Sequence, residues 1–294
     1  MATKTPNVDP KDLLSKAMLI KFSSSCWGAS IHDRSIEGEV AEKHDSNVSM
    51  LRFRKTLLKS EARTAYKNVC REAYTYHRTM TLMWDEGVGL LPATLFWDYN
   101  EKMEAFKRQA DEHADAFVKE YKAQWTNGME DYKKELGDLF NREDYPHPDS
   151  VRHKFGIKIR VRGLENPNDF RVQLGSGQTA AVKAQMMEDL KSDIAEMMRE
   201  PYERLNAVIT KVHAKLSEGD SIFRDTLIEN VKELVGVLPA LNVTGDKTLT
   251  ALVDKIKKEI CVDDIEALRK DNKFRASVAK SAADILKGMR GYVS

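Results

Sequence analysis

The strongest constraint on the fold is a helical stripe of apolar residues over 96–139. Apolar side chains recur there at steps of three and four residues, with one gap at Trp125 and no proline. At about 1.5 Å per residue, such a helix reaches on the order of 65 Å, and its apolar side must be covered. A second stripe over 178–216 repeats the pattern, with a kink expected at Pro201. The two stripes predict an antiparallel coiled-coil arm.

Between the stripes, alternating apolar and polar residues predict a β-hairpin at about 155–175. Residues 157–162 alternate strictly, and residues 170–174 alternate again after a turn region. One face of the hairpin is apolar. The other face is cationic and carries Lys158, Arg160, Arg162 and Arg171. Because a lone hairpin is marginally stable, its apolar face is expected to pack on the arm, on the N-terminal strands or on another subunit.

The remaining segments complete a mainly α fold class with three expected regions. Residues 1–50 form an N-terminal tail with short extended or strand segments, residues 51–217 form the helical arm with its hairpin, and residues 218–294 form a C-terminal helical domain. A further helix is expected over about 51–84, because glycines follow the last residues of its apolar pattern.

That expected helix carries an uncommon row of cations. Five of them recur at every fourth position, namely Lys55, Lys59, Arg63, Lys67 and Arg71. Like charges at this spacing repel one another and need a partner outside the helix. Their separation along the helix is about 6 Å, near the phosphate repeat of nucleic acid. Solvated faces of surface helices are the plainer interpretation of such charge runs.

An acidic protein surface is the other candidate partner for the row. Residues 51–80 hold eight Lys/Arg against two Glu, whereas residues 81–150 hold eight Lys/Arg against sixteen Asp/Glu. The row is therefore expected to face the acidic long helix of this or a neighbouring subunit, or nucleic acid. Opposed charge blocks in one chain also favour a homo-oligomer.

The sequence holds no complete catalytic or metal-binding pattern that we recognise. Zinc ligation is disfavoured because Cys26, Cys70 and Cys261 are scattered. The turn at 174–179 lacks a P-loop lysine, and Gly156 stands where a metal-dependent nuclease needs its second carboxylate. We predict a protein without catalytic residues or cofactor. A site built from residues distant in sequence remains open.

The compartment follows from the cysteines and the absence of long apolar runs. An odd, scattered set of three thiols is typical of a reducing cytoplasm. No apolar run approaches the roughly 18–20 residues that span a bilayer, and the N-terminal segment has no apolar signal core. A cytoplasmic protein without a membrane partner is expected.

Four stretches distributed along most of the chain are informative together: Trp27-Gly28, 91–96, 238–246 and 268–289. They resemble a domain family of unknown function found mainly in tailed phages and prophages, often encoded beside a MoxR-type AAA ATPase and a von Willebrand A protein. The resemblance implies a phage or prophage origin, a bacterial host cytoplasm and a ring ATPase as candidate partner. The family often has Arg or Lys soon after Trp-Gly, whereas Ala29-Ser30 stand here.

These observations lead to two expectations of function. The first is a non-enzymatic, self-assembling interaction protein, acting as a scaffold or adaptor. The alternative is a nucleic-acid-binding accessory protein of phage DNA metabolism that uses the cation row and the cationic face of the hairpin.

Overall fold

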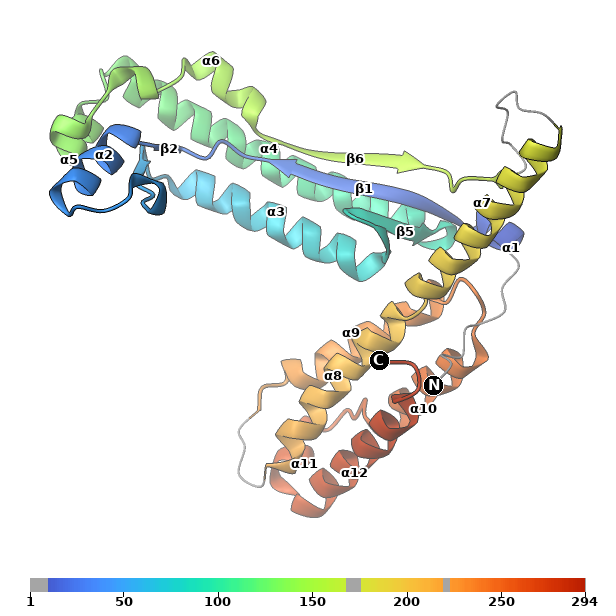
Figure 1. Ribbon diagram of the computed structural model, residues 1–294. Coiled ribbons are helices and arrows are strands. Elements are labelled where there is room, and N and C mark those ends of the chain that lie inside the picture. The colour runs from blue at the N-terminus through green and yellow to red at the C-terminus, as the bar shows by residue number, and fades with distance from the viewer. Residues whose placement is uncertain (1–9, 168–175, 219–222, 294) are drawn as a thin grey trace. The chain divides into compact units, whose positions relative to one another are not determined.

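The computed structural model describes residues 10–167, 176–218 and 223–293, and helices make up most of them (Figure 1). The mainly α fold class is thereby confirmed. Within these ranges, no helix is both long and apolar enough to cross a membrane.

The chain divides into two compact units. Unit 1 combines Met1–Lys21, Tyr76–Tyr99 and Arg160–Ser294. Unit 2 combines Phe22–Thr75 and Asn100–Ile159.

A four-stranded sheet has the order β4-β5-β1-β6. Its strands are β1 (Ala17–Ser25), β4 (Leu82–Asp85), β5 (Val88–Pro92) and β6 (Gly156–Arg162). The antiparallel pairing of β1 with β5 runs from Ala17 opposite Pro92 to Lys21 opposite Val88. The predicted strand over 157–162 is therefore present and lies beside an N-terminal strand, whereas the predicted partner over 170–174 lies outside the described residues.

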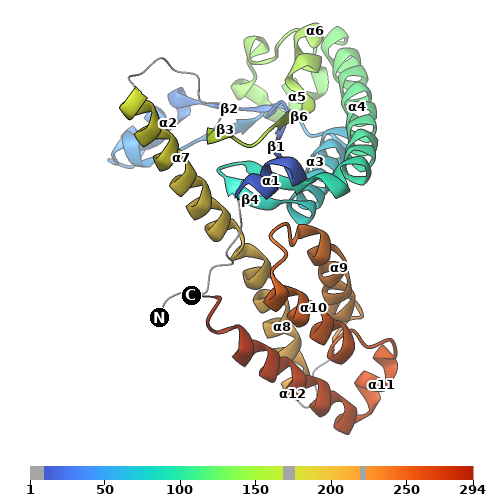
Figure 2. The same ribbon diagram turned by 90° about the vertical axis from the view of Figure 1, so that its right-hand side faces the viewer.

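Unit 1 contains a helical bundle (Figure 2). The bundle consists of α8 (Glu200–Ser217), α9 (Thr226–Leu241), α10 (Lys247–Glu259), α11 (Ile265–Lys270) and α12 (Asn272–Met289). Unit 1 also contains α1 (Pro10–Lys16) and α7 (Ser176–Met197), and α7 contacts α1 and β4. The apolar face of α8 packs against α9 and α12. Leu205, Ile209 and Val212 on that face are fully buried, so α8 is covered within unit 1.

The second apolar stripe is divided at residues 198–199. Pro201 stands in the first turn of α8 instead of kinking one continuous helix. Proline suits this position because the first helical N–H groups have no intrahelical acceptor. The predicted kink at Pro201 is therefore wrong, and a new helix begins there.

A guanidinium group joins α8 to the end of α3 (Glu61–Met80). Arg204 donates to the carbonyl oxygens of Arg78 (2.8 Å), Thr79 (3.2 Å) and Thr81 (2.6 Å). It also pairs with Glu200 at 2.8 Å, and the other carboxylate oxygen of Glu200 accepts from the backbone N–H of Met83. The last carbonyls of α3 and the start of β4 therefore share one anchor.

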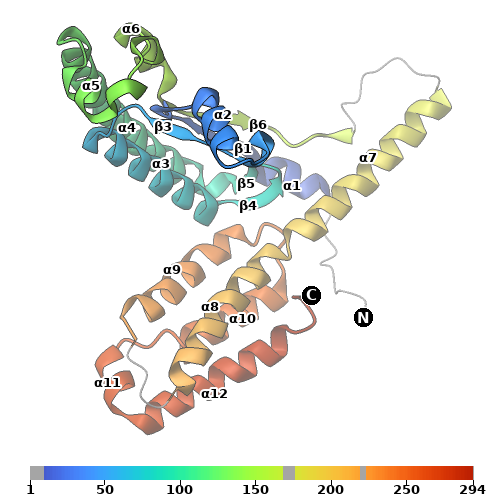
Figure 3. The same ribbon diagram turned by 60° about the vertical axis from the view of Figure 1, so that its left-hand side comes forward.

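Unit 2 contains most of α3 and of α4 (Phe96–Thr126), which run side by side (Figures 1 and 3). Smaller elements accompany them: α2 (Arg34–Lys43), β2 (Ser30–His32), β3 (Arg54–Thr56), α5 (Glu130–Leu136) and α6 (Pro148–Val151). The apolar stripe of α4 is buried here, where the Phe117 ring contacts the rings of Trp27 and Phe155.

Two of the predicted helices are shorter than expected. The helix over 96–139 ends at Thr126, because Gly128 and Met129 take left-handed backbone angles before α5 begins. The helix over 51–84 begins at Glu61, because residues 54–56 form a strand paired with β2. The pairing of the two stripes in a coiled-coil arm stays a prediction.

Gly89 of β5 allows a close approach to Thr81. A Cβ at this position would lie 2.4 Å from the Thr81 hydroxyl oxygen and 2.6 Å from its Cβ. We expect Gly89→Ala to lower the free energy of unfolding by about 1–3 kcal/mol, the usual cost of overpacking. Gly236→Ala is the control, because Gly236 is exposed and a Cβ added there would meet no atom within 4 Å. Alanine at this helical position should raise the free energy of unfolding by about 0.5–1 kcal/mol. Urea unfolding compares them, and an unchanged midpoint for Gly89→Ala would contradict this packing.

His77 makes the stability of the fold depend on pH. Its side chain is 3% exposed, Nδ1 lies 2.9 Å from the Tyr99 hydroxyl, and burial, aided by Arg78, lowers its pKa to about 4. Because the unfolded chain takes up this proton near its ordinary pKa of about 6.5, the unfolding free energy should fall by on the order of 3 kcal/mol between pH 6.5 and 4.

The His77 contribution is measurable by thermal unfolding across this pH range. His77→Gln should remove that part of the pH slope, whereas His113→Gln on α4 should leave it in place. Superimposable slopes for wild type and His77→Gln would show that burial of this imidazole does not control the acid response.

Candidate partner-binding surface

Helix α3 presents three cations of the predicted row on one side. Ser60 precedes the helix, and its side-chain and backbone oxygens accept from the backbone N–H groups of Arg63 and Thr64. This N-terminal cap fixes where the helix begins. Positions spaced by four share one helix side. The α3 cation row consists of Arg63, Lys67 and Arg71.

Arg63 is held by neutral groups. Its Nε donates to the carbonyl oxygen of Trp27 at 2.9 Å, and its Nη2 donates to the carbonyl of Gly28. These carbonyls belong to the segment that connects β1 to β2, in which buried Ala29 has a left-handed φ of 47°. Carbonyl oxygens orient the guanidinium and leave its charge without a counter-charge. Arg63 thus stabilises the segment between β1 and β2 while remaining a cation without a counter-charge.

Lys67 and Arg71 are exposed, as is Lys59 in the segment before the helix. Arg71 donates to the side-chain oxygen of Asn68 at 3.1 Å. Among the residues that the structure describes, no carboxylate lies within 4.0 Å of Lys59 or of any member of the α3 cation row. The row is therefore uncompensated by ion pairing within unit 2.

The acidic side of α4 has other partners in the same unit. Asp111 and Asp115 pair with Arg152 at 2.7 and 2.6 Å. Glu120 accepts a hydrogen bond from the Ser60 hydroxyl at 2.8 Å. Intramolecular pairing of the row with these carboxylates, one of the options from sequence, is thus not found in unit 2. Neighbouring acidic residues of α4, such as Glu101 and Glu112, remain exposed.

Lys55 does not belong to the surface row. It lies on β3, is 5% exposed, pairs with Asp33 at 3.3 Å and Asp144 at 2.7 Å, and donates to the Leu139 carbonyl oxygen at 2.8 Å. The two carboxylates outweigh the cost of burial and raise the pKa of this lysine. The prediction that Lys55 belongs to a helical cation row is therefore wrong. Its role is to join β3 to the segments around 33 and 139–144.

Strand β6 displays the expected cationic face. Lys158, Arg160 and Arg162 are exposed and alternate with Ile157 and Ile159, which are half-buried. Lys158 falls in unit 2, whereas Arg160 and Arg162 fall in unit 1. Arg171 lies outside the described residues.

Thiol chemistry is not promoted beside the α3 cation row. Burial raises the pKa of Cys26, although the charges of Arg63 and Lys67 oppose this effect. Burial likewise raises the pKa of Cys70, which hydrogen-bonds Tyr66 one turn earlier on α3. A thiol with a raised pKa stays protonated at neutral pH and is a poor nucleophile. In the described ranges, no group of three or more His, Cys, Asp or Glu side chains is placed to hold a metal ion.

Comparison of the chain with protein-family models, curated proteins and solved structures found no match.

The buried ion pairs of Lys55 with Asp33 and Asp144 were not predicted from the sequence. Asp33 and Asp144 are far apart in the chain, and nothing in their local sequence connects them to Lys55. The available signal was Ser60, a strong helix-capping residue placed after Lys55 and Lys59.

Removing the charge of Lys55 should destabilise the fold, because this lysine is buried and does not belong to the candidate binding surface. Lys55→Met leaves two largely buried carboxylates without their cation, and we expect a loss of about 3–5 kcal/mol in the free energy of unfolding. The control Lys59→Met, at an exposed position, should stay within about 0.5 kcal/mol of wild type. Chemical denaturation measures both variants. Equal stabilities would argue against the buried ion pairs.

Proposed function

We propose that the chain is a non-enzymatic interaction protein that self-associates, with the α3 cation row of one copy facing the acidic side of α4 in another. The observation that carries this proposal is the uncompensated row of Arg63, Lys67 and Arg71, with Lys59 beside it. Exposed carboxylates on α4 of the same unit supply the complementary charge. A contact between two different surfaces of identical chains is heterologous and builds rings or filaments.

Charge alone does not hold such an assembly together. Each exposed ion pair contributes roughly 0–1 kcal/mol and weakens with salt, so these pairs mainly set orientation and association rate. Apolar contact must supply much of the remaining affinity. Tyr74, one turn beyond Arg71, is 51% exposed, and Met50 of unit 2 is 82% exposed. These side chains are candidates for that apolar contribution.

The resemblance to the phage and prophage family gives this proposal a setting. It implies the cytoplasm of a bacterial host as the compartment and a ring ATPase as a second candidate partner. An adaptor that oligomerises presents many copies of its binding surface to the ring ATPase, which raises the avidity of weak contacts. The scaffold or adaptor role belongs to the same proposal.

Nucleic acid is the second candidate partner. Unit 2 exposes four cations that have no ion pair among the described residues: Lys59, Lys67, Arg71 and Lys158. Cations without an ion pair are available to bind phosphate groups. Neutralising Z phosphates would give a plot of log affinity against log salt with a slope of about −0.9Z for duplex DNA. This slope distinguishes nucleic-acid binding from self-association without DNA.

Light scattering at tens of micromolar protein, over a range of salt and with or without DNA, tests both candidates. Wild type should form a defined oligomer that ignores DNA and dissociates as salt rises. The variant Lys59→Glu/Lys67→Glu/Arg71→Glu should be at least tenfold weaker in self-association, because three favourable charges become unfavourable. Arg63 is kept, since it donates to the carbonyl oxygens of Trp27 and Gly28.

The matched control reverses three exposed lysines of unit 1, Lys211→Glu/Lys255→Glu/Lys280→Glu, and should assemble as wild type does. A wild-type monomer whose mass rises only with DNA, with a slope flattened in the first variant, would replace self-association by nucleic-acid binding. A monomer indifferent to DNA would remove both candidates.

A further inference from the structure

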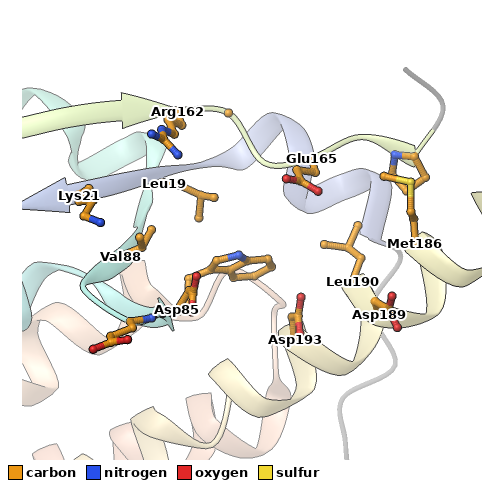
Figure 4. A pocket seen from close by; sticks show the side chains of 14 residues that line it. Leu19, Lys21, Asp85, Val88, Arg162, Glu165, Met186, Asp189, Leu190 and Asp193 are labelled. Atoms are coloured by element: carbon orange, nitrogen blue, oxygen red, sulfur yellow. Dashed lines mark hydrogen bonds between the residues drawn. The ribbon is translucent and has the colours of Figure 1, made fainter. Parts of the chain in front are cut away.

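Unit 1 contains a pocket of about 370 Å³ where the sheet meets α7 (Figure 4). Its volume lies within the roughly 300–1,000 Å³ of small-molecule sites. Leu19 of β1, Trp84 of β4 and Leu190 of α7 provide apolar lining. Figure 4 shows Leu190 directed from α7 toward the side on which Leu19 lies. An apolar wall of this kind suits the alkyl or aromatic part of an organic ligand.

Charged side chains in the pocket are divided between its sides. Lys21 and Arg162 lie on the strands, whereas Asp189 and Asp193 lie on α7, with Asp85 across the pocket from Asp193 (Figure 4). Carboxylates outnumber cations in the lining. Among the described residues, no Lys or Arg lies within 4.0 Å of Asp85, Asp189 or Asp193. The pocket therefore carries an excess of uncompensated negative charge.

The electrostatics of Asp193 agree with this geometry. Burial raises the pKa of Asp193, and the negative charges of Asp189, Glu196 and Asp85 raise it further. Asp189 and Asp193 are also four residues apart on α7, a spacing at which like charges destabilise a helix. Asp85, Asp189 and Asp193 are exposed, so water screens this repulsion in part, and a positive charge in the pocket would reduce it further.

The size and lining of the pocket narrow the kind of cation. A bare metal ion would leave most of the 370 Å³ and the apolar wall unused. An anion would be repelled by the excess of carboxylates. An ammonium or guanidinium group on an alkyl stem uses both features, since its charge pairs with carboxylates and also interacts favourably with the face of an indole such as Trp84.

We propose that this pocket binds a small organic cation, an alkylguanidinium or alkylammonium, with its charge between Asp85 and Asp193 and its stem against Trp84, Leu19 and Leu190. Lys21 and Arg162 also line the pocket and can pair with a carboxylate at the other end of such a ligand. The proposal concerns unit 1 and is independent of self-association through α3.

Isothermal titration with butylguanidine and butylurea tests the charge requirement directly. The two probes have nearly the same shape and differ in charge. The full chain should bind butylguanidine at least tenfold more tightly than butylurea, and the preference should shrink as salt rises. Equal affinities, or no detectable binding of butylguanidine at millimolar concentration, would overturn the proposal.

Variants then locate the site. Asp85→Asn/Asp193→Asn conserves shape and should weaken butylguanidine at least tenfold while leaving butylurea unchanged. Glu188→Gln is the matched control, because Glu188 lies exposed on α7 outside the pocket lining. An unaltered affinity in the double variant, or displacement of butylguanidine by equimolar Ca²⁺, would refute the assignment.

Two further probes identify the source of the cation. Free arginine binding more tightly than butylguanidine, with the gain lost in Arg162→Gln, supports a metabolite that uses both ends of the pocket. A capped Gly-Arg-Gly peptide binding more tightly than free arginine supports an arginine side chain of a protein. Repeating the titrations with the Lys59→Glu/Lys67→Glu/Arg71→Glu variant should give the same affinities, which separates this site from the proposed association surface.

Discussion

The contact between Arg204 and the end of α3 is the interaction on which the arrangement of unit 1 depends. A helix ends with carbonyl groups that lack intrahelical donors, and a guanidinium can satisfy several of them while matching the negative end of the helix dipole. Because Glu200 binds Arg204 and also accepts from Met83 at the start of β4, one ion pair fixes α3, β4 and α8 together. Asp85, at the end of β4, is positioned for the pocket by the same anchor.

Periodic patterns predicted elements better than they predicted contacts. The alternation over 157–162 gave a strand because side chains of a strand point alternately to two faces. The four-residue spacing of cations misplaced Lys55, since it continued by coincidence into a strand that ends before Ser60. The helix over 96–139 was predicted too long, because its apolar stripe continues beyond Gly128, where the backbone turns left-handed and α4 has ended. The pocket was invisible from sequence, because Leu19, Trp84, Arg162 and Asp193 come from four separate segments.

Lysines and arginines of this chain serve two distinct purposes, and burial separates them. Lys55 and Arg204 are enclosed by carboxylates and carbonyls, so their charge is used to join elements. Lys67 and Arg71 have no acidic partner in their unit and leave their charge available at the surface. Arg63 has both roles, because it holds the segment between β1 and β2 through neutral carbonyls while remaining a cation. Formal charge in a sequence therefore says little about function until burial is known.

The position of β6 at the end of the strand order has a consequence for solubility. Among the described strands, β6 has a neighbour on one side only, and the predicted partner strand over 170–174 lies outside the described residues. An edge strand without a partner is a template for pairing with strands of foreign chains. Lys158, Arg160 and Arg162 give this strand a dense positive charge, which repels a second copy of β6 before backbone hydrogen bonds can form. The cations of β6 thus disfavour edge-to-edge pairing of two copies at this strand, whatever else they bind.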